Sequence, residues 1–396
     1  MLNDRLDRLQ EFPFKRLAKL LGSVEPGFAD TLDLGIGEPQ HAPPQLLAET
    51  VAANAGSWNR YPPVNGTAGF RQTAVDWLTR RYGLPAGALD EARNVLPLAG
   101  TKEGLFLLPQ MLVPERTASR TPAVLMPNPV YAVYAGAAAM SGAEPVYLDV
   151  TRETGFLPDL DALDPALLDR CAVFYVCTPS NPQGSVADMA YLRRAVRLAR
   201  RHDFVLAVDE CYSEIYDGEP PRGALEAAWA EDGSFANVLV FHSLSKRSNA
   251  AGLRSGFVAG DPALIGRFHR LRAYSGAVQP LPLMAAATAL WRDETHVEEN
   301  RERYRRKIDV AQRRLGNRFG FYRPEGGFFL WLDVGDGEAA ALRLWERAGV
   351  RTLPGGYLAS ASADGSNPAT PYLRLALVHE DEVVDRACTR ILETLG

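Results

Sequence analysis

Lys246 stands in a sequence context that suits covalent chemistry. It follows the apolar run 238–241, which predicts a buried strand, and Ser243 and Ser245 precede it. Arg254 follows eight residues later and opens a second strand-like run. An amine fixed at a strand end is suited to attack the aldehyde of a phosphorylated cofactor, because a nearby cation keeps the amine unprotonated. Taken alone, Lys246 is better interpreted as a solvated loop lysine.

Two further polar residues follow apolar runs of the same kind. The run 171–177 precedes Asn181, and the run 204–208 ends in Asp209. We therefore expect three strands to present Asn181, Asp209 and Lys246 just beyond their carboxyl ends. That is where open α/β sheets bind ligands.

Each of these side chains has a distinct use on a pyridoxal ring. Asp209 would keep the ring nitrogen protonated, which makes the ring an electron sink. Asn181 and the hydroxyl of Tyr212 would bond to the phenolic oxygen, and Arg254 would meet the phosphate. Lys246 would join the aldehyde carbon and, once displaced by substrate, act as the base.

The order and spacing of these residues carry a family resemblance. The motifs are Asn181-Pro182-x-Gly184, Asp209-x-x-Tyr212 and Ser243-x-Ser245-Lys246 followed by Arg254. Together they resemble the signature of the fold-type-I, class I/II aminotransferases, which use pyridoxal 5'-phosphate, and the resemblance covers essentially the whole chain. It implies an α/β fold with a mostly parallel, seven-stranded type of sheet covered by helices, a smaller α+β domain, and a homodimer with shared active sites.

Within the family, the chain is similar to the N-succinyldiaminopimelate aminotransferases. The matching segments are 36–41, 61–63, 245–249 and 252–261. This resemblance implies transfer of an amino group from glutamate to N-succinyl-2-amino-6-oxopimelate, in diaminopimelate and lysine synthesis. Three residues differ from those usual in these enzymes, which leaves open a related substrate instead: Gln183, Ala251 and Ala99.

A second phosphate element is expected just after the run 95–99. Gly100 allows a tight turn, and the N–H groups of Thr101 and Lys102 open a helix, whose amino end binds anions. Alone, the segment is better interpreted as an N-cap, but beside the arginine and serines of the lysine motif a phosphate site is preferred. The resemblance stacks Tyr131 on the cofactor ring, whereas sequence alone favours a core tyrosine equally.

Arg374 interrupts the apolar run 372–377, where a buried charge is costly unless it is paired. Its planar fork matches a carboxylate, and the resemblance assigns it the substrate α-carboxylate; a structural ion pair is the alternative. Gly37 would let the backbone approach the same carboxylate, with a plain turn as the alternative. The resemblance also places Tyr61 at the partner subunit's phosphate, although sequence alone indicates an exposed loop aromatic.

The distal carboxylates of a succinylated acceptor require further cations. The candidates are Lys102, Arg247, Arg270 and Arg272, and each is equally consistent with a solvated side chain. Two rival functions stay open. One is another pyridoxal-phosphate enzyme of the same fold, such as a C–S lyase or a different amino-acid aminotransferase. The other is a regulatory protein, which would need a DNA-binding module for which there is no room before Asp33.

Composition and charge agree with an enzyme acting on small molecules. The chain has 396 residues, 46% of them hydrophobic and 23% charged, which favours two domains. The net charge of −5 gives no reason to expect nucleic acid. The charged N-terminus lacks a signal-peptide core, and no apolar run has the ~18 residues of a membrane helix. The four cysteines (171, 177, 211 and 388) show no zinc spacing, so we expect a cytoplasmic protein without a metal. Cys211, close to Asp209, is preferred as a small buried filler, with a residue lining the site as the alternative.

The order of elements predicts the architecture. Strand and helix signals alternate, which indicates a mostly parallel sheet covered on both faces. After about Arg292 the pattern changes to a long charged helix, further strands and a C-terminal helix. We therefore expect an N-terminal helix and arm of the small domain at 1–45, a large cofactor-binding domain at 46–290 and a C-terminal small domain at 291–396.

Overall fold

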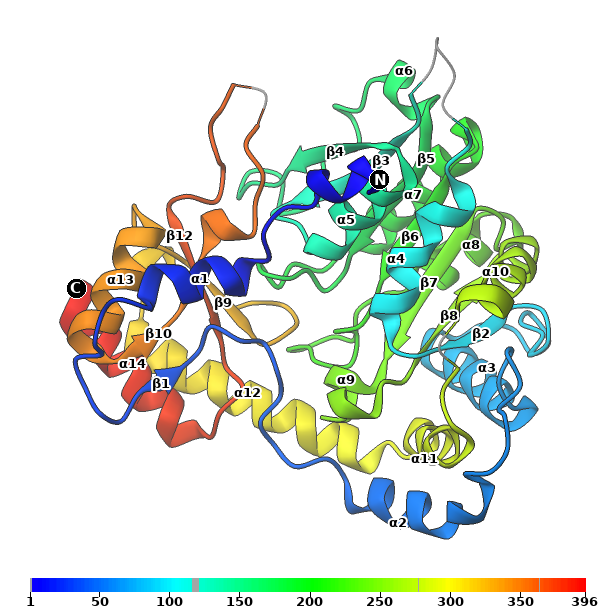
Figure 1. Ribbon diagram of the computed structural model, residues 1–396, viewed down its shortest axis with the longest axis horizontal. Helices are drawn as coiled ribbons and strands as arrows, with labels where there is room; N and C mark the ends of the chain where they lie inside the picture. The colour runs from blue at the N-terminus through cyan, green and yellow to red at the C-terminus, as the bar shows by residue number, and fades with distance from the viewer. Residues whose placement is uncertain (1, 116–120, 277, 363) are drawn as a thin grey trace.

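The computed structural model describes residues 2–115, 121–276, 278–362 and 364–396. Its largest sheet has seven strands (Figure 1). Its strands run in the order β2-β8-β7-β6-β5-β3-β4. Neighbouring strands are parallel except in the two pairs that include β8. The prediction of a mostly parallel, seven-stranded α/β sheet is confirmed. The strands are β2 (Val95–Leu98), β3 (Ala123–Asn128), β4 (Glu144–Asp149), β5 (Cys171–Cys177), β6 (Val205–Asp209), β7 (Val238–Ser243) and β8 (Gly256–Gly260).

Helices bury both faces of this sheet, which explains why its strands read as continuous apolar runs. Every residue of β6 and β7 is buried. Alternate strand residues divide between two cores: α3, α7, α8 and α11 pack on one, and α4, α5 and α10 on the other. These helices are α3 (Ala68–Tyr82), α7 (Met189–His202), α8 (Ala224–Asp232), α11 (Leu281–Arg292), α4 (Thr101–Leu112), α5 (Ala132–Ser141) and α10 (Pro262–Ser275).

A smaller body with its own core follows the large sheet. Its three-stranded antiparallel sheet has the order β11-β12-β9, and β1 pairs in parallel with β10 beside it. The long charged helix expected from the sequence is α12. Its apolar side packs in one core with α13 and α14. The elements are β1 (Leu32–Asp33), β9 (Phe329–Asp333), β10 (Val350–Arg351), β11 (Leu353–Pro354), β12 (Tyr372–Ala376), α12 (Thr295–Leu315), α13 (Gly337–Ala348) and α14 (Asp381–Leu395).

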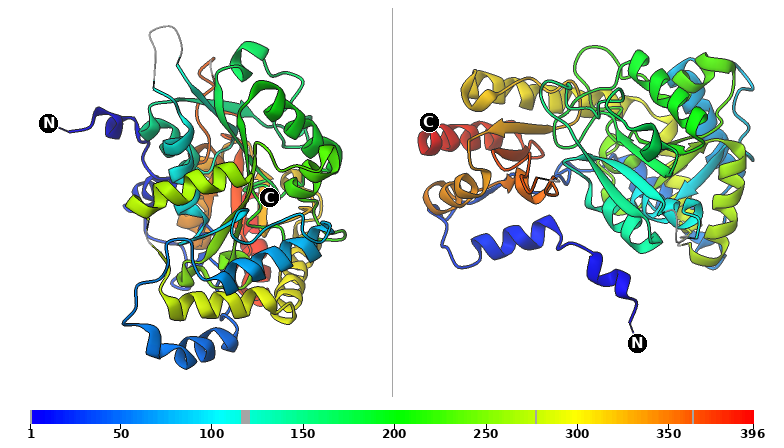
Figure 2. Two further views of the ribbon diagram at one scale, coloured as in Figure 1. Left: turned by 90° about the vertical axis from the view of Figure 1, so that its right-hand side faces the viewer. Right: turned by 90° about the horizontal axis from the view of Figure 1, so that it is seen from above.

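The N-terminal segment connects the two bodies (Figure 2). Helix α1 (Pro13–Leu21) packs on β11 and α13 of the smaller body. The 3₁₀ turn η1 (Asp4–Arg8) instead packs on α5 of the larger body, where the Arg5 guanidinium donates to the carbonyl of Met140 (2.9 Å). Helix α2 (Gln45–Ala53) then begins the larger body by packing on α11. We propose the domain boundaries expected above, 1–45, 46–290 and 291–396, with residues 4–8 of the N-terminal arm packed on the larger body.

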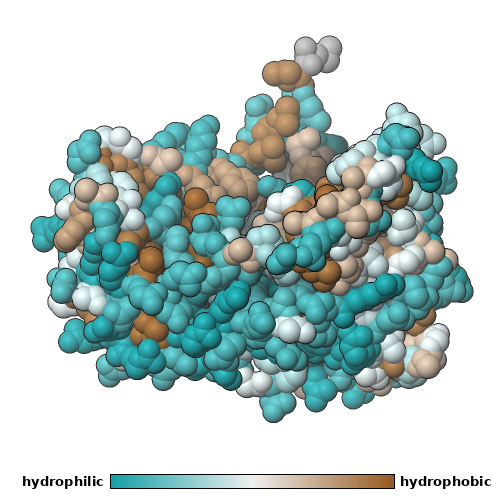
Figure 3. Space-filling view, turned by 90° about the horizontal axis from the view of Figure 1, so that it is seen from below, coloured by the Kyte–Doolittle hydropathy of each residue, from teal (hydrophilic) through white to brown (hydrophobic). Residues whose placement is uncertain are grey.

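The surface is mostly hydrophilic, with a few exposed apolar side chains. Figure 3 shows hydrophobic residues on the N-terminal segment where it projects from the molecule. Leu2 and Leu6 in this segment, and Trp58 in the loop after α2, are at least 47% exposed. None of the helices in the described part of the chain is both long enough and apolar enough to cross a membrane.

Candidate active site

The carboxyl ends of β5, β6 and β7 meet at one edge of the large sheet. In register, Cys177 at the end of β5 pairs with Asp209 at the end of β6. Asn181 lies four residues beyond β5, and Lys246 lies in α9 (Leu244–Arg247), the short helix that follows β7 directly. The sheet thus brings together the three side chains that the apolar runs were expected to present.

A pocket of about 600 Å³ opens at this edge, between the two bodies. Both bodies contribute to its walls. Most of the predicted site residues line it: Gly37, Thr101, Lys102, Tyr131, Asn181, Asp209, Tyr212, Ser243, Ser245, Lys246, Arg254 and Arg374.

Two predicted residues, Gly100 and Tyr61, are not among the lining residues. Gly100 lies directly behind Arg254, which lines the pocket. Its φ is +82°, and a Cβ there would overlap the guanidinium of Arg254, so a glycine is needed at this position. Tyr61 is fully exposed on the loop after α2. Its expected reach into the partner subunit stays a prediction.

The amine of Lys246 is held inside the pocket. Its Nζ donates to the carbonyl of Gly37, from the smaller body, and lies 5.3 Å from the ring centroid of Phe328. Burial, with a smaller contribution from the positive charge of Arg374, lowers the pKa of the Lys246 ammonium to about 8. About a tenth of the amine is therefore neutral, and nucleophilic, at pH 7, far more than for an ordinary lysine.

Asp209 is a buried carboxylate without a cationic partner among the described ion pairs. Its Oδ2 accepts a bond from the hydroxyl of Tyr134 (2.7 Å), and its Oδ1 accepts one from the N–H of Cys211 (3.2 Å). Burial raises the pKa of Asp209, because the charged form loses its hydration. The carboxylate is therefore placed to receive a cation from a bound molecule.

Arg374 presents the opposite situation on the smaller body. It is 3% exposed in the middle of β12, and no described carboxylate pairs with it. One Nη donates to Asn181 Oδ1 (3.1 Å), the other donates to the carbonyl of Gly35 (2.9 Å), and Nε has no partner. Its guanidinium lies 4.4 Å from the ring centroid of Phe329. Burial lowers the pKa of Arg374 to about 10, so it stays charged at neutral pH. The structural ion pair that was the alternative interpretation is absent from the described residues, and an external carboxylate would supply the missing acceptors.

One side of the pocket is built to hold an anion. Thr101 begins the twelve-residue helix α4, whose first N–H groups and dipole favour negative charge. The guanidinium of Arg254 is held nearby by the carbonyls of Ala251 (2.8 Å) and Ala99 (3.4 Å). Ser243 and Ser245 add hydroxyls that bond to each other at 2.9 Å. Together they form a cationic, hydroxyl-lined recess.

Aromatic rings line the rest of the site. Tyr131 packs edge-on against Tyr134, with 5.5 Å between ring centroids, and Tyr134 stacks on Tyr175 at 4.3 Å. Tyr212 makes edge-to-face contacts with Phe328 and Phe329, with 5.5 and 5.8 Å between ring centroids. These contacts hold the tyrosine rings around the buried carboxylate and the amine.

A family model of aminotransferase class I and II matches residues 29–391. The chain belongs to the class I and II aminotransferases. The enzyme is therefore a pyridoxal-phosphate-dependent aminotransferase, as the resemblance of its motifs implied.

Relatives and solved structures agree with this assignment over the full length of the chain. The transaminase OxyQ of Streptomyces rimosus, named for 4-dedimethylamino-4-oxo-anhydrotetracycline, is 34% identical and covers 97% of this chain and 99% of its own. An LL-diaminopimelate aminotransferase of Desulforudis audaxviator is 33% identical over 89% of each chain. An aminotransferase structure from Neisseria meningitidis superimposes with a TM-score of 0.94, at 35% identity and 100% coverage of both chains.

The pocket of this aminotransferase suits pyridoxal phosphate. The recess around Arg254 matches the dianionic phosphate, and the unpaired carboxylate of Asp209 matches a protonated ring nitrogen. The Lys246 amine lines the same pocket and is suited to an aldehyde. The phosphate, the ring nitrogen and the aldehyde of the cofactor would thus each meet a suitable side chain.

Some residues of the aminotransferase pocket were missed or interpreted differently from the sequence. Tyr134, which bonds Asp209, lies three residues after Tyr131 on one face of α5, and that spacing was the available signal. Cys211 was expected to be a filler, but it lines the pocket, with Sγ 3.1 Å from Thr101 Oγ1. The pocket also contains Phe12, from the N-terminal segment, for which the sequence gives no local signal.

The four cations expected to bind the distal carboxylates of the acceptor differ in their positions in the structure. Lys102 lines the pocket, whereas Arg270 is exposed on α10 away from it. Arg247 and Arg272 are buried elsewhere, in ion pairs with Glu294 (3.0 Å) and Glu103 (2.9 Å). Of the four, only Lys102 lines the pocket.

Proposed function

We propose that the enzyme transfers the amino group of glutamate to N-succinyl-2-amino-6-oxopimelate. The α-carboxylate assignment rests on the surroundings of Arg374: this buried cation bonds an amide oxygen and a carbonyl and has no carboxylate partner among the described residues. The diaminopimelate part of the acceptor is supported by the relatives named LL-diaminopimelate aminotransferase. The succinyl group rests on the sequence motifs, and Lys102 supplies a cation for a distal carboxylate.

The side chains divide the work of the reaction among them. Bound pyridoxal phosphate supplies an aldehyde that joins the substrate nitrogen and a ring that accepts electrons. Arg374, positioned by Asn181, grips the α-carboxylate with two parallel hydrogen bonds and so fixes the direction of the Cα–H bond. Lys246, with its lowered pKa, takes the Cα proton and later returns it. Asp209 supplies a fixed negative charge, and Tyr212 supplies a phenolic hydroxyl beside the pocket.

An acceptor panel with glutamate as donor tests the proposed substrate. We expect kcat/KM for the succinylated oxopimelate to exceed the values for its acetylated counterpart and for oxaloacetate, because only the succinyl group adds a terminal carboxylate. Formation of 2-oxoglutarate measures each reaction. A preference for oxaloacetate would overturn the acceptor while leaving the aminotransferase assignment intact.

Replacing Arg374 with alanine is expected to raise KM for glutamate and for the acceptor alike, by roughly 10²-fold, since a buried charged hydrogen bond is lost. Steady-state kinetics with each substrate varied in turn measures the effect. An amine donor without a carboxylate is the control, because its KM should not change. An effect on one of the two α-carboxylate substrates alone would assign Arg374 to a distal group instead.

We also propose that the enzyme is a homodimer with shared active sites. Trp58, Tyr61 and Tyr274 are 54%, 101% and 91% exposed, and aromatic side chains are enriched at protein–protein interfaces. A second copy of the chain would cover them and bring Tyr61 to the partner's phosphate recess. The proposed location is the cytoplasm, in keeping with a biosynthetic role.

A further inference from the structure

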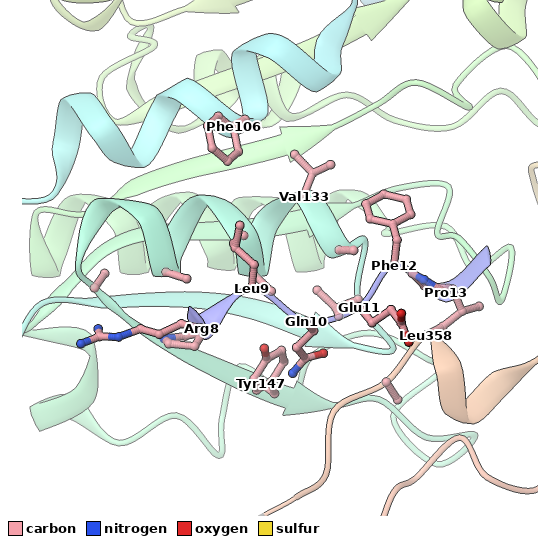
Figure 4. A pocket seen from close by; sticks show the side chains of 18 of the residues that line it. Arg8, Leu9, Gln10, Glu11, Phe12, Pro13, Phe106, Val133, Tyr147 and Leu358 are labelled. Carbon is pink, nitrogen blue, oxygen red and sulfur yellow. The ribbon is translucent and has the colours of Figure 1, made fainter. Parts of the chain in front are cut away.

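A second cavity of about 610 Å³ adjoins the active-site pocket (Figure 4). The two cavities share part of their walls, so a ligand bound in one borders directly on the other. The shared residues are Phe12, Pro13, Lys102, Val130, Ala132 and Leu358. We call this second cavity the N-terminal pocket, because residues 8–13 form one of its sides.

The walls of the N-terminal pocket are largely apolar. On one side, α5 presents Gly136 and neighbouring small residues, which leave room beside the helix. On the other side, Leu9 and Phe12 of the N-terminal segment point toward α5 (Figure 4), and each stays about two-fifths exposed, at 42% and 41%. Such walls suit the methylene groups of an extended chain.

The N-terminal segment is anchored on both sides of the pocket. Arg5 bonds the carbonyl of Met140 at the end of α5, and Gln10 Nε2 donates to Ser360 Oγ (3.2 Å). Helix α1 begins directly after the segment, at Pro13. The segment is therefore a fixed wall, and the cavity behind it has a defined shape.

The charges around the N-terminal pocket leave two cations available. Its acidic residues are already paired: Glu11 with Lys19 (2.7 Å) and Glu144 with Arg170 (2.6 Å). Lys102, on the shared wall, lies 5.1 Å from the ring centroid of Phe12, and Arg8 lines the pocket elsewhere. Neither Lys102 nor Arg8 forms an ion pair with a described carboxylate. The pocket thus offers apolar walls and two cations to an anionic ligand.

We propose that the N-terminal pocket binds the distal arm of the acceptor, an acyl chain that ends in a carboxylate. This inference rests on the proposed function and names the part of the enzyme that selects its acceptor. With the reacting end held at Arg374, the arm passes Phe12 and enters the second cavity. Lys102 meets the carboxylate nearer to the reacting carbon, and Arg8 meets the terminal one.

Filling the cavity tests the steric part of the inference. A Cβ at Gly136 would meet Leu9 Cδ2 at 3.6 Å, an ordinary contact, so Gly136→Leu places its remaining carbons in the pocket. We expect KM for the succinylated acceptor to rise by about 10-fold or more. The glutamate half-reaction and KM for oxaloacetate should stay unchanged. Gly266→Leu in α10 is the matched control, because a Cβ there meets nothing within 4 Å, and melting temperatures check folding.

Removing the distal cation tests the electrostatic part. Arg8→Gln should raise KM for the succinylated acceptor by about 10-fold, the usual weight of one charge-assisted hydrogen bond. An N-butyryl acceptor has the same length without the terminal carboxylate, so its KM should not respond.

The outcomes separate this inference from the proposed function. If the wild-type enzyme uses the succinylated acceptor and Gly136→Leu leaves its KM unchanged, the N-terminal pocket is not the distal site, and the proposed function stands. If Arg8→Gln weakens both acyl acceptors equally, the contact with the terminal carboxylate is wrong. If the wild-type enzyme converts glutamate but rejects the succinylated acceptor, the proposed function fails and the inference fails with it.

Discussion

Replacing Lys246 with alanine is expected to abolish amino transfer. The variant loses both the nucleophile for the cofactor aldehyde and the base for the substrate proton, so two functions disappear together. We expect kcat to fall by about 10⁴-fold or more. Borohydride reduction in the presence of pyridoxal phosphate should add mass to the wild-type protein and none to the variant, as measured by mass spectrometry.

Lys102→Ala is the control for this experiment, because Lys102 lines the same pocket and its loss should leave the labelling intact. The lowered pKa of Lys246 adds a pH test. Capture of the cofactor by the apoprotein should accelerate as pH rises and level off above about 8, since the neutral amine is the reacting form. Retained transamination in Lys246→Ala, or labelling at Lys102 instead, would contradict the assignment.

The positions of Asn181, Asp209 and Lys246 could be predicted because they depend on local sequence. A strand buried on both faces must be apolar throughout, so the first polar residues after it mark its carboxyl end. Parallel neighbours then bring these ends to one edge of the sheet. The observed strands β5, β6 and β7 lie side by side as that argument requires.

Contacts between distant parts of the chain could not be predicted in this way. Arg247, Arg272 and Arg374 are all buried arginines, and the sequence around each gives no sign of its partner. Glu294 pairs with the first and Glu103 with the second, which ties both to the scaffold. Arg374 meets an amide and a carbonyl instead, and therefore keeps its charge for a ligand. The long-range partner, and not the residue type, separates a structural arginine from a binding one.

The N-terminal segment gives a second example of the same limit. Its residues are charged and apolar in a pattern that predicts a helix and an arm, but not their destination. The arm crosses from the smaller body to α5, which places Phe12 in two cavities at once. Such a path depends on tertiary packing, so a pocket formed by this segment is harder to predict than the residues at the strand ends.

Replacing Asp209 with asparagine is expected to weaken cofactor binding and to lower kcat by roughly 10²–10⁴-fold. The amide has nearly the shape of the carboxylate, and its single oxygen still accepts the bond from Tyr134, so the change removes the charge and the longer bond from the N–H of Cys211. Without that charge, a protonated ring nitrogen loses its counter-ion in a buried site. Titration with pyridoxal phosphate measures binding, and single-turnover conversion of glutamate measures the rate.

Tyr134→Phe separates the charge of Asp209 from the bond that positions it. This variant loses the 2.7 Å bond to Oδ2 but keeps the carboxylate, so we expect a smaller loss of rate, about tenfold. A larger loss of rate in Asp209→Asn than in Tyr134→Phe would show that the charge of the carboxylate is what the reaction needs. Near-normal kinetics in Asp209→Asn together with a severe defect in Tyr134→Phe would mean that the tyrosine hydroxyl, and not the charge of Asp209, supports the reaction.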